Sequence, residues 1–169
     1  DDKTPNAYEE AFDGLTTSGS NQVINGVSGN DLIRYDSESF SGATIHLAIM
    51  PSSDTIANGG VYNDYGITFK PEMVEGLTVG YAQQEDDSVA GATNQVDDTT
   101  MYVKYVYGSI TAGVQDSEGD SNTDSADVET LGIGISYAVS DELSISYGQH
   151  TVEFPNDSTK SDQESSAVS

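Results

Sequence analysis

The sequence predicts an all-β fold whose antiparallel strands run up and down. Apolar residues alternate with small or polar residues in segment after segment, whereas helical periodicity is weak almost everywhere. The connections alternate too, because a short turn is followed by a long loop rich in Asp, Ser, Asn and Gly. An up-and-down barrel places all its short turns at one end and all its long loops at the other, so this pattern favours a barrel.

The alternation defines eight strands, each about as long as a tilted membrane strand needs to be. They are expected near 29–37, 42–50, 61–70, 76–84, 99–108, 109–116, 127–138 and 142–153. Short turns are expected at 37–41, 71–75, 108–109 and 140–141, and long loops at about 51–60, 85–98 and 117–126. The three long loops contain 9 of the 29 Asp and Glu residues and the four short turns contain 4, so acidic charge is concentrated at the rim that carries the loops.

The clearest alternation lies in 131–147, which predicts a hairpin with two unlike faces. One parity carries apolar residues such as Ile133 and Ile135, and the other carries Gly132, Gly134 and further small residues. In a soluble sandwich the apolar face would pack on a second sheet. In an outer-membrane barrel it would face lipid, and the small polar face would line water.

Composition excludes several functions. The 169 residues suit one domain, and the absence of Cys excludes disulfides and thiolate metal sites. The chain has 29 acidic against 5 basic residues, a formal charge of −24, so we expect no nucleic-acid partner. No apolar run is long enough for a membrane helix. No nucleophile–base set, phosphate loop or dinucleotide motif is present, so we expect neither an enzyme nor a cofactor.

Aromatic residues of the apolar parity gather close to the short turns. Such a position fits an aromatic girdle at one membrane interface, although tyrosine is also common in ordinary strands. The girdle is predicted to contain Tyr35, Phe69, Tyr105, Tyr107 and Tyr137.

Three hairpins resemble those of the Gram-negative trimeric general porins. They are 30–42 (NDLIRYDSESFSG), 105–113 (YVYGSITAG) and 136–148 (SYAVSDELSISYG). The first resembles the family pattern N-x-h-x-Y-x-S-P-x-F-x-G, with Glu38 in place of the usual Pro. The family forms 16-stranded barrels whose third long loop folds inward as a constriction.

The resemblance implies a part of such a barrel. Residues 1–28 would be the constriction-loop segment, 29–154 the strands with their turns and loops, and 155–169 a truncated acidic extracellular loop. It also implies residence in the outer membrane of a Gram-negative bacterium, contact with its lipid, and a homotrimer.

Parity places every Lys and Arg of the predicted strands on the small, polar face, namely Arg34, Lys70 and Lys104. A charge facing lipid at mid-membrane costs about 2–4 kcal/mol, so a basic strip on a pore wall is expected. Solvated charges on a soluble sheet are the alternative. His46, Asp64 and His150 share this parity and are expected to face the lumen. The two histidines are too far apart in sequence to suggest a metal pair, and no metal site is predicted.

The start of the chain supplies the opposing charges. Glu9, Glu10 and Asp13 follow Pro5 in a short helical pattern and resemble the acidic residues of the family's constriction loop. An acidic loop against a basic wall would create a transverse field that orients polar solutes. A disordered acidic segment is the alternative.

The predicted function is diffusion of small hydrophilic solutes and ions through a water-filled barrel. The sign of its ion preference stays open, because the acidic mouth favours cations and the basic wall favours anions. The alternative is a secreted or surface-exposed soluble β-sandwich that binds a ligand or partner through acidic loops. That alternative requires Ile133, Ile135, Leu143 and Ile145 to pack against another sheet.

Overall fold

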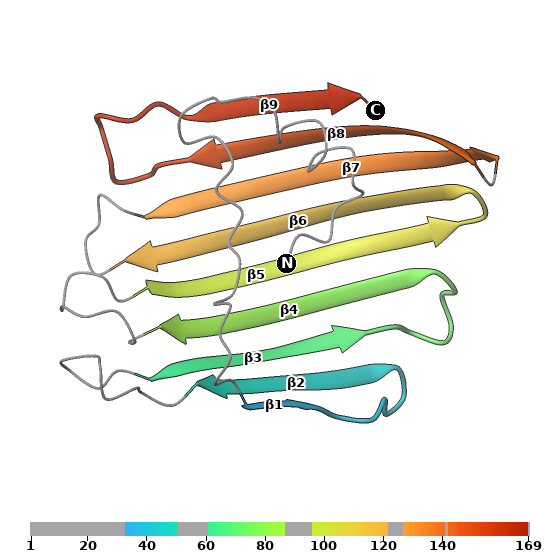
Figure 1. The fold of residues 1–169 in the computed structure, drawn as a ribbon, viewed down its shortest axis with the longest axis horizontal. Coiled ribbons are helices and arrows are strands. Elements are labelled where there is room, and N and C mark those ends of the chain that lie inside the picture. The colour runs from blue at the N-terminus through green and yellow to red at the C-terminus, as the bar shows by residue number, and fades with distance from the viewer. Residues whose placement is uncertain (1–32, 51–60, 87–95, 122–126, 141, 169) are drawn as a thin grey trace.

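In the part of the chain that the structure describes, nine antiparallel strands form one sheet in strict sequence order (Figure 1). The computed structural model describes residues 33–50, 61–86, 96–121, 127–140 and 142–168. The strands are β1 (Ile33–Asp36), β2 (Ala43–Met50), β3 (Tyr62–Phe69), β4 (Leu77–Asp86), β5 (Val96–Tyr107), β6 (Ile110–Ser121), β7 (Val128–Ser140), β8 (Leu143–Glu153) and β9 (Gln163–Val168). Each strand pairs with its neighbours in sequence, which is the up-and-down arrangement predicted above.

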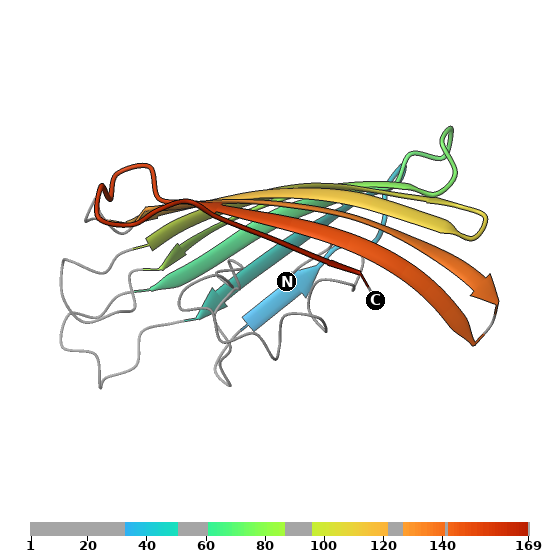
Figure 2. The same cartoon turned by 90° about the horizontal axis from the view of Figure 1, so that it is seen from above.

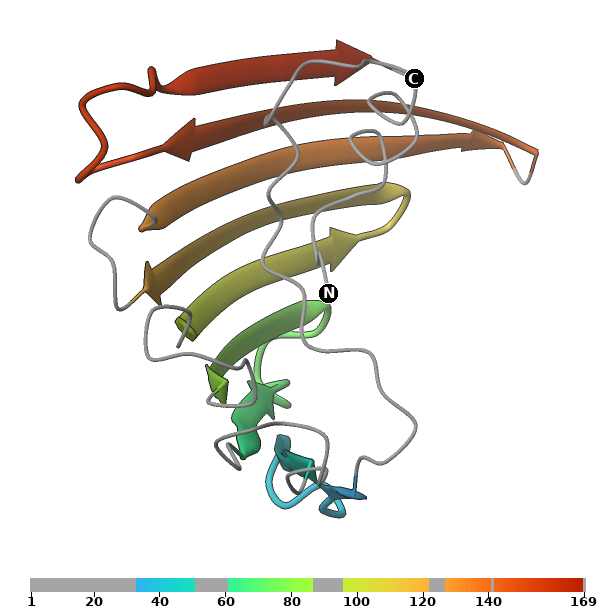
Figure 3. The same ribbon diagram turned by 60° about the vertical axis from the view of Figure 1, so that its left-hand side comes forward.

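The sheet is curved and open. Seen from above, it arches over a concave side (Figure 2), and the turned view shows the strands winding round like part of a barrel wall (Figure 3). In the described part of the chain, β1 and β9 are the two edges and do not pair with each other. The all-β barrel prediction is therefore confirmed as a curved, unclosed sheet.

Three of the four short turns contain a glycine with positive φ, namely Gly42, Gly76 and Gly108. Gly76, in the turn between β3 and β4, has a φ of +85°, and a methyl group there would collide with the carbonyl oxygen of Val106 on β5. Only glycine combines this conformation with so close an approach of two backbones. Gly42 fills the same role in the turn before β2, where its φ is +84°.

Two predicted boundaries differ from the structure. Strand β9 lies inside the segment 155–169 that we predicted as a loop, so the described residues form nine strands where eight were predicted. Strands β5 and β6 extend further toward the long loops than their apolar residues do, since Asp97 pairs with Asp120 and Thr99 with Glu118. At these ends both faces of the sheet carry polar side chains, and backbone hydrogen bonds hold the strands together. The alternation of apolar and polar residues stops there, so it could not predict how far the strands extend.

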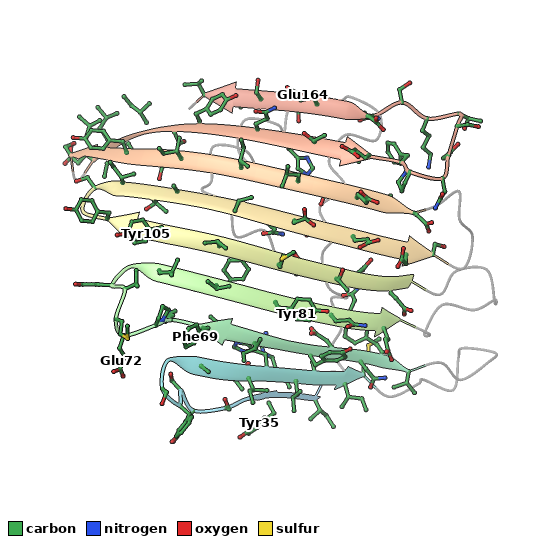
Figure 4. All side chains as sticks on the ribbon, turned by 180° about the vertical axis from the view of Figure 1, so that it is seen from behind. Tyr35, Phe69, Glu72, Tyr81, Tyr105 and Glu164 are labelled. Carbon is green, nitrogen blue, oxygen red and sulfur yellow. The ribbon has the colours of Figure 1, made fainter. Side chains whose placement is uncertain are left out.

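The convex face is apolar and uncovered. Ile133, Ile135, Leu143 and Ile145 are 41%, 48%, 55% and 52% exposed, and in the described residues only neighbouring strands touch. The soluble-sandwich alternative required these side chains to pack on a second sheet, so the structure contradicts it. Figure 4, seen from the side opposite to Figure 1, looks onto this face, with Tyr35, Phe69, Tyr81 and Tyr105 along it.

The concave face carries the other parity, where side chains converge and are less exposed. Among the described apolar side chains the buried ones are Tyr62, Val152 and Phe154, and all three belong to this parity. Gln115, Ser117, Thr130 and His150 are buried there too. Among the described residues there is thus no apolar core between two layers, and the sheet has an apolar convex face and a polar concave face.

The apolar residues of the convex face form a belt that crosses the strands obliquely. One row of paired residues starts at Ala43, at the turn-side edge of the belt, and runs from β2 to Gln149 on β8. On β8 the turn-side edge is Leu143, six residues away. The belt therefore shifts by about one residue per strand.

That shift measures the tilt of the strands. With a rise of about 3.4 Å per residue and about 4.8 Å between strands, it corresponds to a tilt of about 35° from the normal of the belt. This is within the range of outer-membrane barrels, whose strands tilt by roughly 35–45°. No helix in the described residues is long and apolar enough to cross a membrane.

Candidate functional site

A hydrogen-bonded network holds Arg34 on the concave face. The Arg34 guanidinium donates to both carboxylate oxygens of Asp36, from Nε to Oδ2 at 3.0 Å and from Nη2 to Oδ1 at 3.0 Å. His46 Nδ1 lies 2.6 Å from Asp36 Oδ1, and its Nε2 lies 3.1 Å from Thr68 Oγ1. Three strands thus contribute to one polar cluster, because Asp36 pairs with His46 in the β1–β2 register.

Lys70 and Lys104 lie apart from the Arg34–Asp36 pair, although Lys70 is only two residues from Thr68 along the chain. Phe69 on β3 pairs with Val79 on β4, so Lys70, the next residue, lies opposite Thr78. Thr78 in turn pairs with Lys104 on β5, so the α-carbons of the two lysines are two strands, or about 10 Å, apart. Within the described part of the chain, neither ammonium group forms an ion pair. The predicted strip therefore divides into two unpaired lysines and a separate arginine paired with an aspartate.

Arg34 and Lys104 lie within the depth of the apolar belt, whereas Lys70 lies at its turn-side edge. Arg34 sits between Ile33 and Tyr35 on β1, and Lys104 between Val103 and Tyr105 on β5. These flanking residues are exposed on the convex face, whereas the cations share the opposite parity. Lys70 directly follows Phe69, another exposed belt residue.

A second polar ladder lies nearer the long loops. The Tyr62 hydroxyl donates to Gln84 Oε1 at 3.2 Å and lies 3.4 Å from Asp64 Oδ2, and the Gln84 amide donates to Asp98. Of these residues only Asp64 was predicted from the sequence. Asp36 and Asp98 were missed, although each shares the parity of a predicted lumen residue on its own strand. Parity was thus the signal that could have found them.

The remaining predicted residues are not gathered into the cluster. His150 is buried on the concave face of β8, six strands from His46. The described residues contain no group of His, Asp or Glu side chains arranged to hold a metal ion. Glu9, Glu10 and Asp13 lie outside the described residues, and their role stays a prediction.

Aromatic side chains follow both edges of the belt. At the turn side, the rings of Tyr105 and Tyr107 stack with centroids 6.4 Å apart and planes 11° apart. Tyr35, Phe69 and Tyr137 are exposed on the same face. The loop-side edge carries Tyr65, Tyr81 and Tyr147, which the sequence analysis did not assign to a girdle. The Tyr81 hydroxyl donates to Gln83 at 3.2 Å, toward the polar end of its strand.

Acidic residues occupy the convex face beyond the loop-side edge. Asp116, Glu118, Glu129 and Glu153 line a shallow groove there with parts of β6, β7 and β8. Repulsion from Asp120 is the main cause that raises the pKa of Glu118, with smaller contributions from desolvation and from other nearby acids. The change from apolar to acidic marks where the belt ends.

Comparison with known families agrees with this geometry, since the model of the Gram-negative porin family matches residues 1–169. The chain belongs to the Gram-negative porins. No curated protein and no solved structure matched the sequence. The porin is accordingly an outer-membrane protein of channel-forming type, its convex belt facing lipid and its concave face forming the channel wall. The family as a whole is generally not enzymatic.

Proposed function

We propose that this porin passes small hydrophilic solutes and ions by diffusion, as a homotrimer in the outer membrane. The observation that carries the proposal is that the convex and concave faces of the sheet differ in polarity at the same depth in the membrane. The convex face is an exposed apolar belt, and at belt depth the concave face carries Arg34, Asp36, His46 and Lys104, with Lys70 at the turn-side edge. Charged groups at the depth of the hydrocarbon layer need a water-filled lumen, since a charge facing lipid costs about 2–4 kcal/mol.

The two groups of cations are proposed to act differently. Arg34 and Asp36 form a bidentate pair, so they contribute a fixed dipole and little net charge. Lys70 and Lys104 contribute net positive charge to the wall. The carboxylates of Glu9, Glu10 and Asp13 are proposed to face this wall from the constriction segment. The resulting transverse field would orient polar solutes.

Asp64 and Asp98 are proposed to act before the lysines on the path from the long loops. They would concentrate cations near the mouth, and the lysines would then favour anions further along the path, toward the short turns. Opposite charges in series favour small solutes that carry both signs or none. The proposed solutes are therefore small zwitterions and neutral hydrophilic molecules, together with salt ions.

The test is the reversal potential of the full-length protein in planar lipid bilayers under a salt gradient. Arg34→Ala exposes the Asp36 carboxylate, so selectivity is expected to move toward cations. Asp36→Asn frees the guanidinium and is expected to move selectivity toward anions. The double variant Arg34→Ala/Asp36→Asn removes both charges and serves as the matched control, with a reversal potential close to that of the wild type.

Two results would contradict the proposal at different levels. A full-length wild-type protein that forms no channels would remove the diffusion function altogether. Channels whose selectivity is unchanged in both single variants would remove Arg34 and Asp36 from the permeation path while leaving the channel itself intact.

A further inference from the structure

Tyr102 and Gly80 face each other across two neighbouring strands on the channel wall. They are direct register partners on β5 and β4. Both belong to the concave parity, because Gly80 lies between the convex-face residues Val79 and Tyr81. Gly80 is buried and Tyr102 is half-buried, although nothing in the sequence distinguishes this glycine from others of the same parity.

The Tyr102 ring occupies the space that a side chain at position 80 would need. A methyl group built on Gly80 would lie 2.6 Å from Cζ and 2.9 Å from Cδ1 of the ring, and it would also overlap Cε1. Real side chains do not approach each other so closely. The ring therefore lies across the α-carbon of Gly80, flat against the wall rather than out into the lumen.

The surroundings favour this position. The residues that flank Gly80 on its own strand and face are Thr78 and Ala82, both small. An aromatic ring that covers a glycine in a neighbouring strand gains contact area and shields the exposed backbone there. Gly80 thus supplies a recess one residue wide, and its neighbours leave the ring room to enter it.

The recess lies where the lumen is charged. Tyr102 is flanked by the belt residues Met101 and Val103, so it lies at the depth of the membrane. On the same strand and face it is two residues from Lys104. A ring that left the wall here would project into the path beside that lysine.

We propose that Gly80 is a positioning residue for permeation, which holds the Tyr102 ring against the wall and so keeps the channel open to hydrated solutes beside Lys104. The inference rests on the diffusion function proposed above. In this proposal the width of the channel at the depth of Tyr102 depends on Gly80, a residue without a side chain. Any substitution at position 80 displaces the ring, because the aromatic side chain can rotate about its own bonds whereas the paired backbones cannot separate.

The experiment uses the full-length protein and compares conductance with the passage of neutral sugars of increasing size into liposomes. Gly80→Ala is expected to lower single-channel conductance and to slow larger sugars more than small ones. Its reversal potential is expected to stay that of the wild type, since no charge changes. Gly80→Ala/Tyr102→Ala removes the displaced ring and is expected to restore both readouts.

Two further variants serve as controls. Gly66→Ala adds the same methyl group to the wall on β3, where the nearest atoms are a backbone oxygen at 2.9 Å and the Ala82 methyl at 3.2 Å. The methyl group strains the paired backbones there but meets no ring, so stability is expected to fall while the conductance of the folded channel stays near the wild-type value. Tyr102→Ala alone is expected to change conductance little, because a ring already against the wall obstructs little.

Comparing the electrophoretic mobility of heated and unheated samples would reveal whether Gly80→Ala folds. If it does not fold, the conductance of Tyr102→Ala still tests the inference. A large rise in conductance in Tyr102→Ala would show that the ring projects into the lumen, and would overturn the inference. So would a folded Gly80→Ala channel that behaves like the wild type, or a double variant that is not restored. A wild-type protein without channels would instead remove the proposed function.

Discussion

A charge placed on the apolar belt should cost far more than the same charge one residue away. Ile135 is one of the two central belt residues of β7, where it pairs with Ala112 and Tyr147, and its side chain is 48% exposed. In the membrane this exposed surface meets lipid. Ile135→Arg is therefore expected to destabilise the folded porin by about 2–4 kcal/mol, or roughly 30- to 700-fold in the folding equilibrium.

Two arginine controls separate membrane depth from the general effect of a bulky cation. Ser136→Arg is adjacent in sequence but lies on the channel side, where the charge meets water. It is expected to cost much less and to shift the reversal potential toward anions. Glu129→Arg lies on the convex face beyond the belt, and at that depth an arginine costs at most about 1 kcal/mol.

The measurement is a guanidinium titration of the full-length protein, folded reversibly into lipid bilayers. The three variants should rank with Ile135→Arg the least stable by a clear margin. If Ser136→Arg is as costly as Ile135→Arg, or more costly, then the assignment of the two faces is wrong. Equal stability of Ile135→Arg and Glu129→Arg would contradict the position of the belt.

Three other predictions concern charge and turns. Replacing both Lys70 and Lys104 by Ala should move the reversal potential toward cations, and the same result from an exposed loop lysine would argue against a wall position. Repulsion from Asp120 raises the pKa of Glu118, so the folded state binds the carboxyl proton of Glu118 more tightly than the unfolded chain does. The folded state therefore loses stability as the pH rises through the raised pKa. Glu118→Gln should therefore stabilise the protein at neutral pH and lose this advantage in acid, whereas a benefit independent of pH would refute the cause. Gly76→Ala should destabilise folding by more than about 1 kcal/mol in the same titration, because its φ is +85° and a carbonyl oxygen occupies the space of the methyl group.

Much of the fold could be read from the sequence because strand alternation is a local property. Successive side chains point to opposite faces wherever a strand forms, so Ile133 and Gly132 are assigned to different faces without any knowledge of their partners. The order of the strands followed as well, since short connections join antiparallel neighbours. The same locality explains the error over β9, whose residues Gln163–Val168 show little apolar alternation and depend on pairing with β8.

The candidate site could be predicted only as a list of side chains on one face. Parity placed Arg34, Lys70 and Lys104 together, but it gave no register between strands. Register decides that Asp36 meets His46, ten residues away, and that the resulting cluster pairs Arg34 and leaves the lysines separate. A one-residue change in pairing would alter every such contact, so the sequence could not distinguish a single strip from two groups.

The sequence by itself determined the two-faced sheet, its apolar belt and its polar wall, because these follow from a repeat of two residues along each strand. Only the tertiary structure decided how far the strands extend, how steeply they tilt and which wall residues meet. The contact of Tyr102 with Gly80 shows the reason most clearly. It joins residues 22 positions apart through hydrogen-bonded register and curvature, which are properties of paired strands and not of any one of them.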